Sequence, residues 1–125
     1  MWGMGIFMII KKQINTEQAM YTIESGEFDK EIIASKNKVV VIMTQDWCPQ
    51  WKDLRSWVYE IETDEDIDIY ELEYNKVDYF NAFMNFKENH WKNHNIPYLR
   101  FYKDGSLNKE TNYIEEQQFL DIMDL

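Results

Sequence analysis

The sequence predicts an α/β domain with a mixed central sheet of four to five strands and helices on both faces. Three observations support this prediction. The chain has 125 residues, which suits one domain. Hydrophobic residues make up 45% of it, enough for a full core. Short apolar runs of strand character alternate with amphipathic stretches, and a hairpin and a last helix follow, which is typical of a mixed sheet covered by helices.

The N-terminal residues Met1–Ile10 are apolar apart from two glycines. They are too few to span a bilayer, and they lack the basic start and the cleavage site of a signal peptide. We therefore expect residues 1–19 to be an N-terminal extension that packs on a domain formed by residues 20–125.

The first half of the domain is expected to contain two strands and two helices. Met20–Ile23 is a weak alternating stretch that predicts the first strand. Ser25 is expected to cap a short amphipathic helix that follows it. Val39–Thr44 is a run of mostly β-branched residues, which is typical of a strand buried on both faces.

A second helix is expected to begin directly after this buried strand. Pro49 suits the first position of a helix, where its missing N–H leaves no bond unmade. Leu54, Val58 and Ile61 then recur at helical spacing. Cys48 is therefore predicted to lie at the N-terminus of this helix.

The second half is expected to contain a central strand, a helix, a hairpin and a closing helix, over Ile67–Tyr74, Val77–His90, Tyr98–Tyr113 and Ile114–Asp124. Asp104-Gly105 is a strong signal for the hairpin turn. It would join a strand over Tyr98–Tyr102 to a partner strand over Lys109–Tyr113.

The chain is acidic, with 23 Asp and Glu against 13 Lys and Arg and a net charge of −10. Proteins that bind by neutralising phosphates carry the opposite sign, so the charge argues against nucleic acid and anionic membranes as partners. Eight of the carboxylates fall between Val58 and Glu73 with no basic residue among them. We interpret this run as a solvated helix end and loop, because the spacing and the glycine of an EF-hand calcium site are missing.

Cys48 is the only cysteine. The chain therefore has no intrachain disulfide and no zinc site built on cysteine pairs. A single cysteine that cannot form an intrachain disulfide fits a reducing compartment best, so the expected location is cytoplasmic. No metal and no cofactor is expected.

Two motifs resemble the thioredoxin family. Trp47-Cys48-Pro49 stands at the turn from a buried strand into a helix, and Ile96-Pro97 stands before a later strand and a Lys-Asp-Gly turn. The order of elements is similar from about Met20 to Leu125. The resemblance implies a thioredoxin-like fold in which Pro97 is cis and lies near Cys48, the nucleophile, whose thiol we expect to be at least partly accessible. It also implies substrate-binding residues at Trp47, Pro49, Trp51, Ile96, Pro97 and Tyr98.

The sequence departs from the family at two positions. The family's Cys-x-x-Cys motif is here Cys48-Pro49-Gln50-Trp51, so a tryptophan replaces the resolving cysteine. The family's buried acid, six residues before the first cysteine, is here Ile42. That acid assists proton transfer as the resolving thiol leaves, so the two losses are consistent with each other.

The leading hypothesis for function is monothiol thiol-disulfide exchange, in cell redox homeostasis. A helix N-terminus favours a thiolate, and a thiolate that attacks a disulfide forms a mixed disulfide. With one cysteine, this mixed disulfide must wait for glutathione or another external thiol. The expected partner is a protein disulfide or a glutathione mixed disulfide.

Two alternatives stay open. In the first, Cys48 is a small apolar residue, and the domain binds a protein partner without catalysis through a surface of Trp47, Trp51 and Tyr98. In the second, the protein carries glutathione or an iron–sulfur centre, like the monothiol glutaredoxins, although glutathione-binding motifs are not visible. A cysteine–histidine hydrolase ranks last, because neither a base nor an oxyanion hole is specified.

His90 and His94 are four residues apart, a spacing at which a helix can hold a metal ion. His90 falls on an apolar stripe with Phe83 and Phe86, and His94 lies past the expected end of the helix. We therefore expect structural or exposed histidines. His94 is the candidate for a role near Cys48, because the loop before Pro97 should pass the thiol.

Overall fold

A five-stranded mixed sheet in the order β1-β3-β2-β4-β5 forms the centre of the computed structural model, which describes residues 8–125. β3 pairs in parallel with β1 and β2, whereas β4 runs antiparallel to β2 and to β5. The predicted fold class is confirmed. Residues 1–7 of the predicted N-terminal extension lie outside the described residues. The strands are β1 (Ile9–Gln13), β2 (Lys38–Thr44), β3 (Ile67–Glu73), β4 (Tyr98–Lys103) and β5 (Ser106–Thr111).

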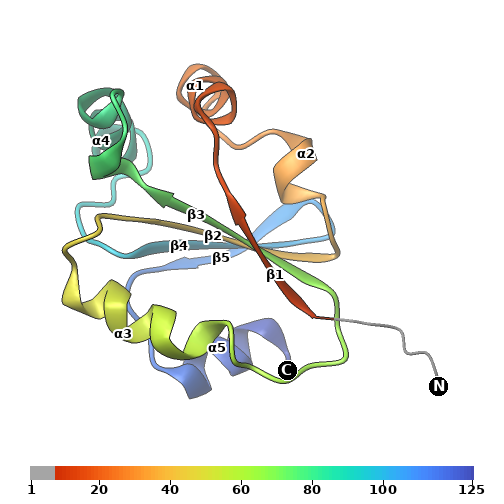
Figure 1. Ribbon diagram of the computed structural model, residues 1–125. Helices are drawn as coiled ribbons and strands as arrows, with labels where there is room; N and C mark the ends of the chain where they lie inside the picture. Colours follow the sequence, from red (N-terminus) through yellow and green to blue (C-terminus); the bar gives the residue numbers. More distant parts are fainter. Residues whose placement is uncertain (1–7) are drawn as a thin grey trace.

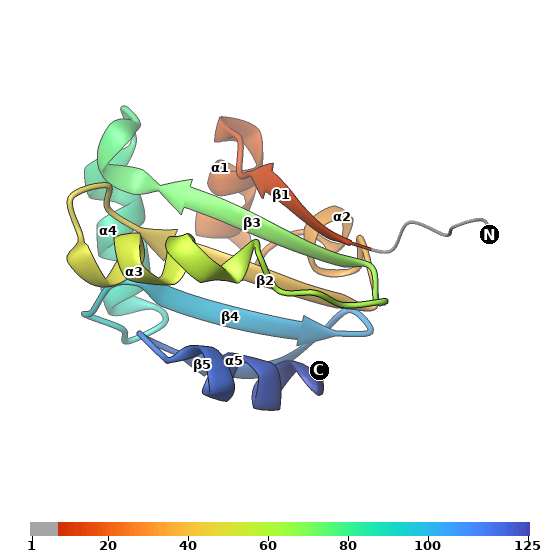
Figure 2. The ribbon, with the colours of Figure 1, turned by 60° about the horizontal axis from the view of Figure 1, so that its bottom comes forward.

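Helices cover both faces of this sheet (Figure 1). One face carries three helices and a short 3-10 turn, namely α1 (Thr16–Ser25), α2 (Lys30–Ile33), η1 (Tyr74–Lys76) and α4 (Phe80–Asn89). The other face carries α3 (Pro49–Val58) and α5 (Glu116–Met123), which lie in front of the sheet in Figure 2.

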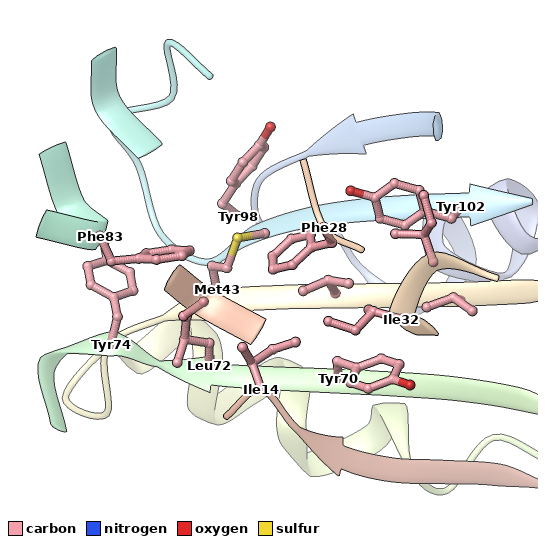
Figure 3. Close-up of a cluster of buried hydrophobic side chains, with 14 of the residues drawn as sticks. Ile14, Phe28, Ile32, Met43, Tyr70, Leu72, Tyr74, Phe83, Tyr98 and Tyr102 are labelled. Carbon is pink, nitrogen blue, oxygen red and sulfur yellow. The ribbon is translucent and has the colours of Figure 1, made fainter. Parts of the chain in front are cut away.

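Two apolar clusters fill the space between the sheet and its helices. The cluster under α1, α2 and α4 is rich in aromatic residues, among them Phe28, Tyr74, Phe83 and Tyr98 (Figure 3). The cluster under α3 and α5 contains smaller aliphatic residues together with Cys48, Trp51, Phe101 and Phe119. β2 contributes alternate residues to both clusters, as expected of a strand buried on both faces.

The chain enters the sheet earlier than the sequence predicted. Ile9–Gln13, inside the segment predicted as an extension, forms the edge strand β1 and pairs with β3. Met20–Ile23 lies in α1, so the predicted first strand is wrong. A capping box between Asn15 and Gln18 begins this helix, and Gly26 ends it with a left-handed φ of +88°.

The other elements lie close to their predicted positions. Ser25 ends α1 rather than capping the next helix, and Asp29 caps the short α2 by accepting a hydrogen bond from the Glu31 N–H. The hairpin turn is at Asp104-Gly105, where both residues have positive φ, of 51° and 79°. β5 therefore begins at once with Ser106 instead of at Lys109.

The acidic run divides into an exposed part and a buried part. Its first five carboxylates lie in the exposed or half-exposed stretch that follows α3. Asp68 and Glu71, in contrast, are buried in β3, so the solvated interpretation is wrong for them. Burial alone raises the pKa of Asp68, but hydrogen bonds from Ser35 and Lys12 outweigh it and hold that pKa below its usual range.

Residues 8–125 hold no group of three or more His, Cys, Asp or Glu side chains arranged for a metal ion. Within the same residues, no helix combines the length and the apolar character that crossing a bilayer requires.

Candidate functional site

Cys48 lies at the turn between β2 and α3. It is the N-cap residue of α3, and Pro49 is the first residue of the helix, as predicted. The Cys48 side chain makes no capping hydrogen bond, whereas its carbonyl accepts one from the Lys52 N–H at 3.1 Å. The sulfur therefore stands at the positive end of the α3 dipole.

The loop before β4 closes over this sulfur. The Ile96–Pro97 peptide bond is cis. The Cys48 thiol donates a weak hydrogen bond to the Ile96 carbonyl, with 3.9 Å between sulfur and oxygen. The structure thus brings the two sequence motifs together. It also leaves Cys48 only 4% exposed, so the expectation of a partly accessible thiol is wrong.

Trp51 is part of the core and not of a binding surface. It is fully buried, and its indole N–H donates to the Glu73 carboxylate at 2.8 Å. The Arg55 guanidinium lies 5.5 Å from the centre of the Trp51 ring and also reaches Glu73, at 3.4 Å. The residue that replaces the resolving cysteine therefore joins the first turn of α3 to the end of β3.

Of the three residues predicted to form a partner surface, only Trp47 is exposed. Tyr98 is as fully buried as Trp51, and Pro97 is buried too, so the side chains of Trp51, Pro97 and Tyr98 form no exposed surface. Pro49 is exposed, and Ile96 is half-buried beside the cysteine. The accessible rim of the site is therefore Trp47, Pro49 and Ile96.

Trp47 is held in place although it is 59% exposed. Its indole N–H donates to the Gln45 side chain at 2.7 Å. The residue before Trp47, Asp46, exchanges two hydrogen bonds with Asn75, at 2.9 and 2.7 Å. These bonds fix the turn ahead of Cys48 and present an ordered aromatic ring to solvent.

A carboxylate lies beside Ile42, the position of the family's buried acid. Ile42 is fully buried, and its partner on β3 is Glu71, which is also buried. The Tyr59 hydroxyl donates to Glu71, and the Lys11 ammonium lies 3.9 Å from it. Glu71 gave no signal of its own in the sequence, because it falls within the acidic run that was expected to be solvated.

Two further buried charges lie on the opposite side of the sheet. Lys87 on α4 donates to the carbonyls of Asn93 and Asn95, and burial lowers its pKa to about 8. The Arg100 guanidinium on β4 donates hydrogen bonds to the Glu27 carboxylate and to the hydroxyl oxygens of Tyr98 and Tyr102. The sequence alone did not indicate that Lys87 is buried.

The two histidines are explained by packing and by surface contacts. His90 stacks on Phe86, with ring centres 5.1 Å apart, and covers the backbone of Gly26. His94 is exposed and faces the Glu88 carboxylate, with 3.6 Å between Nδ1 and the carboxylate oxygen. The hypothesis of a His94 role at Cys48 gains no support from these contacts.

The strand order, the helices on both faces, and a helix-capping cysteine that meets a cis-proline loop together define a thioredoxin fold. The family model described as Thioredoxin matches residues 19–124. The chain therefore belongs to the thioredoxin family.

Solved structures agree with this assignment at the level of the fold. Thioredoxin O1 of Arabidopsis thaliana in its oxidised state has a TM-score of 0.61 and 16% identity, over 94% of this chain and 96% of that one. A mutant thioredoxin from Halobacterium salinarum has a TM-score of 0.59 and 18% identity, over 94% and 88%. Oxidised thioredoxin from Plasmodium falciparum has a TM-score of 0.56 and 19% identity, over 76% and 86%. No curated protein matches the chain.

Proposed function

We propose that this domain carries out monothiol thiol-disulfide exchange through Cys48 in a reducing, cytoplasmic setting. The observation that carries the proposal is the single cysteine at the N-cap of α3, in contact with the Ile96-Pro97 loop of a thioredoxin-family domain. A helix N-terminus stabilises negative charge, and the thiolate is the species that attacks a disulfide.

The exchange needs two steps. The Cys48 thiolate attacks one sulfur of a target disulfide, the target S–S bond breaks, and the other target sulfur leaves as a thiolate. Because Trp51 occupies the place of the resolving cysteine, a glutathione thiolate from outside attacks the target sulfur of the mixed disulfide, the S–S bond to Cys48 breaks, and Cys48 leaves as a thiolate. When the mixed disulfide is itself with glutathione, the products are oxidised glutathione and free Cys48.

The rim residues support a role in target contact. Trp47 and Pro49 are exposed, and Ile96 is half-buried against the sulfur. Apolar and aromatic side chains around a reactive group are suited to an extended segment of a partner protein. The target is therefore a protein disulfide or a protein carrying a glutathione mixed disulfide, and the step itself uses no cofactor.

Intact-mass spectrometry tests the proposal directly. Native protein is incubated with oxidised glutathione near neutral pH, and we expect one glutathione per chain, removed again by a reducing agent. Cys48→Ser is the control and should gain none. The proposal is overturned if native protein stays unmodified while the urea-unfolded protein gains the adduct.

The exposure of Trp47 favours a second candidate, a non-catalytic domain that binds a protein partner. An ordered, exposed tryptophan is the kind of side chain that dominates binding energy at interfaces. This candidate predicts that native Cys48 forms no glutathione adduct. It also predicts that Trp47→Ala, and not Cys48→Ser, abolishes association with the partner.

A further inference from the structure

The segment between α4 and Pro97 is held in place by side chains from outside it. Residues 91–97 form neither helix nor strand, and Lys92 among them has a left-handed φ of +60°. Backbone carbonyls in such a segment need hydrogen-bond donors from other elements. Lys87 and Asn112 supply those donors.

Lys87 binds the segment from the side of α4. Its side chain has no exposed surface, and its Nζ donates to the carbonyl of Asn93 at 2.9 Å and to that of Asn95 at 2.8 Å. Within residues 8–125, no carboxylate lies within ion-pair distance of this Nζ. Burying an amine costs free energy unless its N–H groups are bonded, and here they bond the segment.

Asn112 binds the same segment from the residue that follows β5. Its amide nitrogen lies 3.2 Å from the Asn95 carbonyl and 3.1 Å from the Pro97 carbonyl. The Asn93 and Asn112 side chains also bond each other, at 2.9 and 3.0 Å. The carbonyls on both sides of Ile96 are therefore fixed.

We propose that Lys87 and Asn112 form a clamp that controls access to Cys48. The Ile96 carbonyl, which accepts from the thiol, lies between the two carbonyls that Asn112 holds. With the clamp closed, the thiol is buried. When the clamp opens, Ile96 moves away from the Cys48 sulfur, and the sulfur becomes accessible to a target disulfide. The sheet and its helices stay folded. Lys87 and Asn112 are thus positioning residues.

The role of the clamp rests on the proposed function, thiol-disulfide exchange at Cys48. Access to the thiol can be measured independently of that function, by alkylation. Native protein is alkylated with iodoacetamide at several urea concentrations below the unfolding transition, and modification of Cys48 is followed by intact mass. Access through a local opening gives a rate that hardly depends on urea, whereas access through global unfolding gives a rate that rises steeply with urea.

We expect Asn112→Ala to raise the urea-independent rate about tenfold, because it removes hydrogen bonds on both sides of Ile96. Lys87→Met should have an effect of similar size. Asn108→Ala is the matched control, since Asn108 is exposed on β5 and lies outside the clamp, and its rate should equal that of the wild type.

A merely structural role would change only the urea-dependent part of the rate, in proportion to the lost stability. Equal urea-independent rates in the wild type and Asn112→Ala would therefore overturn the clamp. If Lys87→Met does not fold, Asn112→Ala and Asn112→Asp decide the question. Faster alkylation of Asn112→Ala, together with no glutathione adduct on the native protein, would support the clamp and reject the exchange. A glutathione adduct on the native protein, together with equal alkylation rates, would support the exchange and reject the clamp.

Discussion

At the scale of single residues, Trp51 shows how a motif position can differ from its family role. The motif alone suggested a surface residue, because the family has a reactive cysteine there. The helical spacing of Trp51, Leu54 and Val58 indicates the opposite, since these residues share one face of α3 and all three are buried. Sequence periodicity was therefore the better guide to this side chain than the motif.

Replacing Trp51 with cysteine should damage the fold before it restores redox chemistry. We expect Trp51→Cys to lower the free energy of unfolding by about 3–5 kcal/mol, because a large buried side chain leaves a cavity and Glu73 loses a donor. Urea unfolding measures this. Trp47→Ala, at an exposed position, should stay within about 0.5 kcal/mol of the wild type. A Trp51→Cys protein of wild-type stability would show that the indole is not core.

Lys87 makes stability depend on pH in a direction that can be calculated. Burial lowers its pKa to about 8 in the folded protein, whereas lysine in an unfolded chain has a pKa of about 10.4. Between these values the unfolded chain binds more protons than the folded one, so the free energy of unfolding rises with pH.

Relative to Lys87→Met, the wild type should therefore gain up to about 1.4 kcal/mol per pH unit between pH 8 and about pH 10.4, and nothing below or above this interval. Urea unfolding of both proteins from neutral to alkaline pH gives the difference, in which the other titrating groups cancel. A difference that is constant or that falls with rising pH is incompatible with a lysine that loses its proton early.

At the scale of elements, the two N-terminal errors have different physical sources. β1 pairs with a neighbour on one side only and contains two lysines, so it lacks the apolar run that marks a central strand. The next segment, Met20–Ile23, contains residues common in strands, but the caps at Asn15 and Gly26 decide for a helix. These capping signals are visible in the sequence, and they outweigh the strand character of the four residues between them.

Gly26 should be the residue at which this helix end is most sensitive. Its φ of +88° is strained for other residues, and an added Cβ would lie 2.9 Å from the His90 ring. We expect Gly26→Ala to cost about 1–2 kcal/mol in thermal or urea unfolding. The double variant Gly26→Ala/His90→Ala should recover the part that is due to the ring. A stable Gly26→Ala protein would remove this explanation.

At the scale of the whole molecule, the approach of Cys48 to Pro97 follows from the topology. One motif follows β2 and the other precedes β4, and these strands are antiparallel neighbours in which Met43 pairs with Tyr98. The resemblance to the thioredoxin family therefore sufficed to predict that these two motifs meet. The sequence could not predict that the thiol is covered, because the covering segment accepts hydrogen bonds from Lys87 on α4 and from Asn112 after β5, and neither residue belongs to the two motifs.

The measurement that tests the central claim most directly is the rate at which the protein reduces the disulfides of insulin, followed against the concentration of added glutathione. A single-cysteine mechanism predicts no turnover without glutathione and a rate that rises with it, while Cys48→Ser stays at the uncatalysed rate throughout. A Cys48-dependent rate, taken as the wild type minus Cys48→Ser, that does not rise with the glutathione concentration would contradict external resolution. Equal rates for the wild type and Cys48→Ser at every concentration would contradict exchange at Cys48 itself.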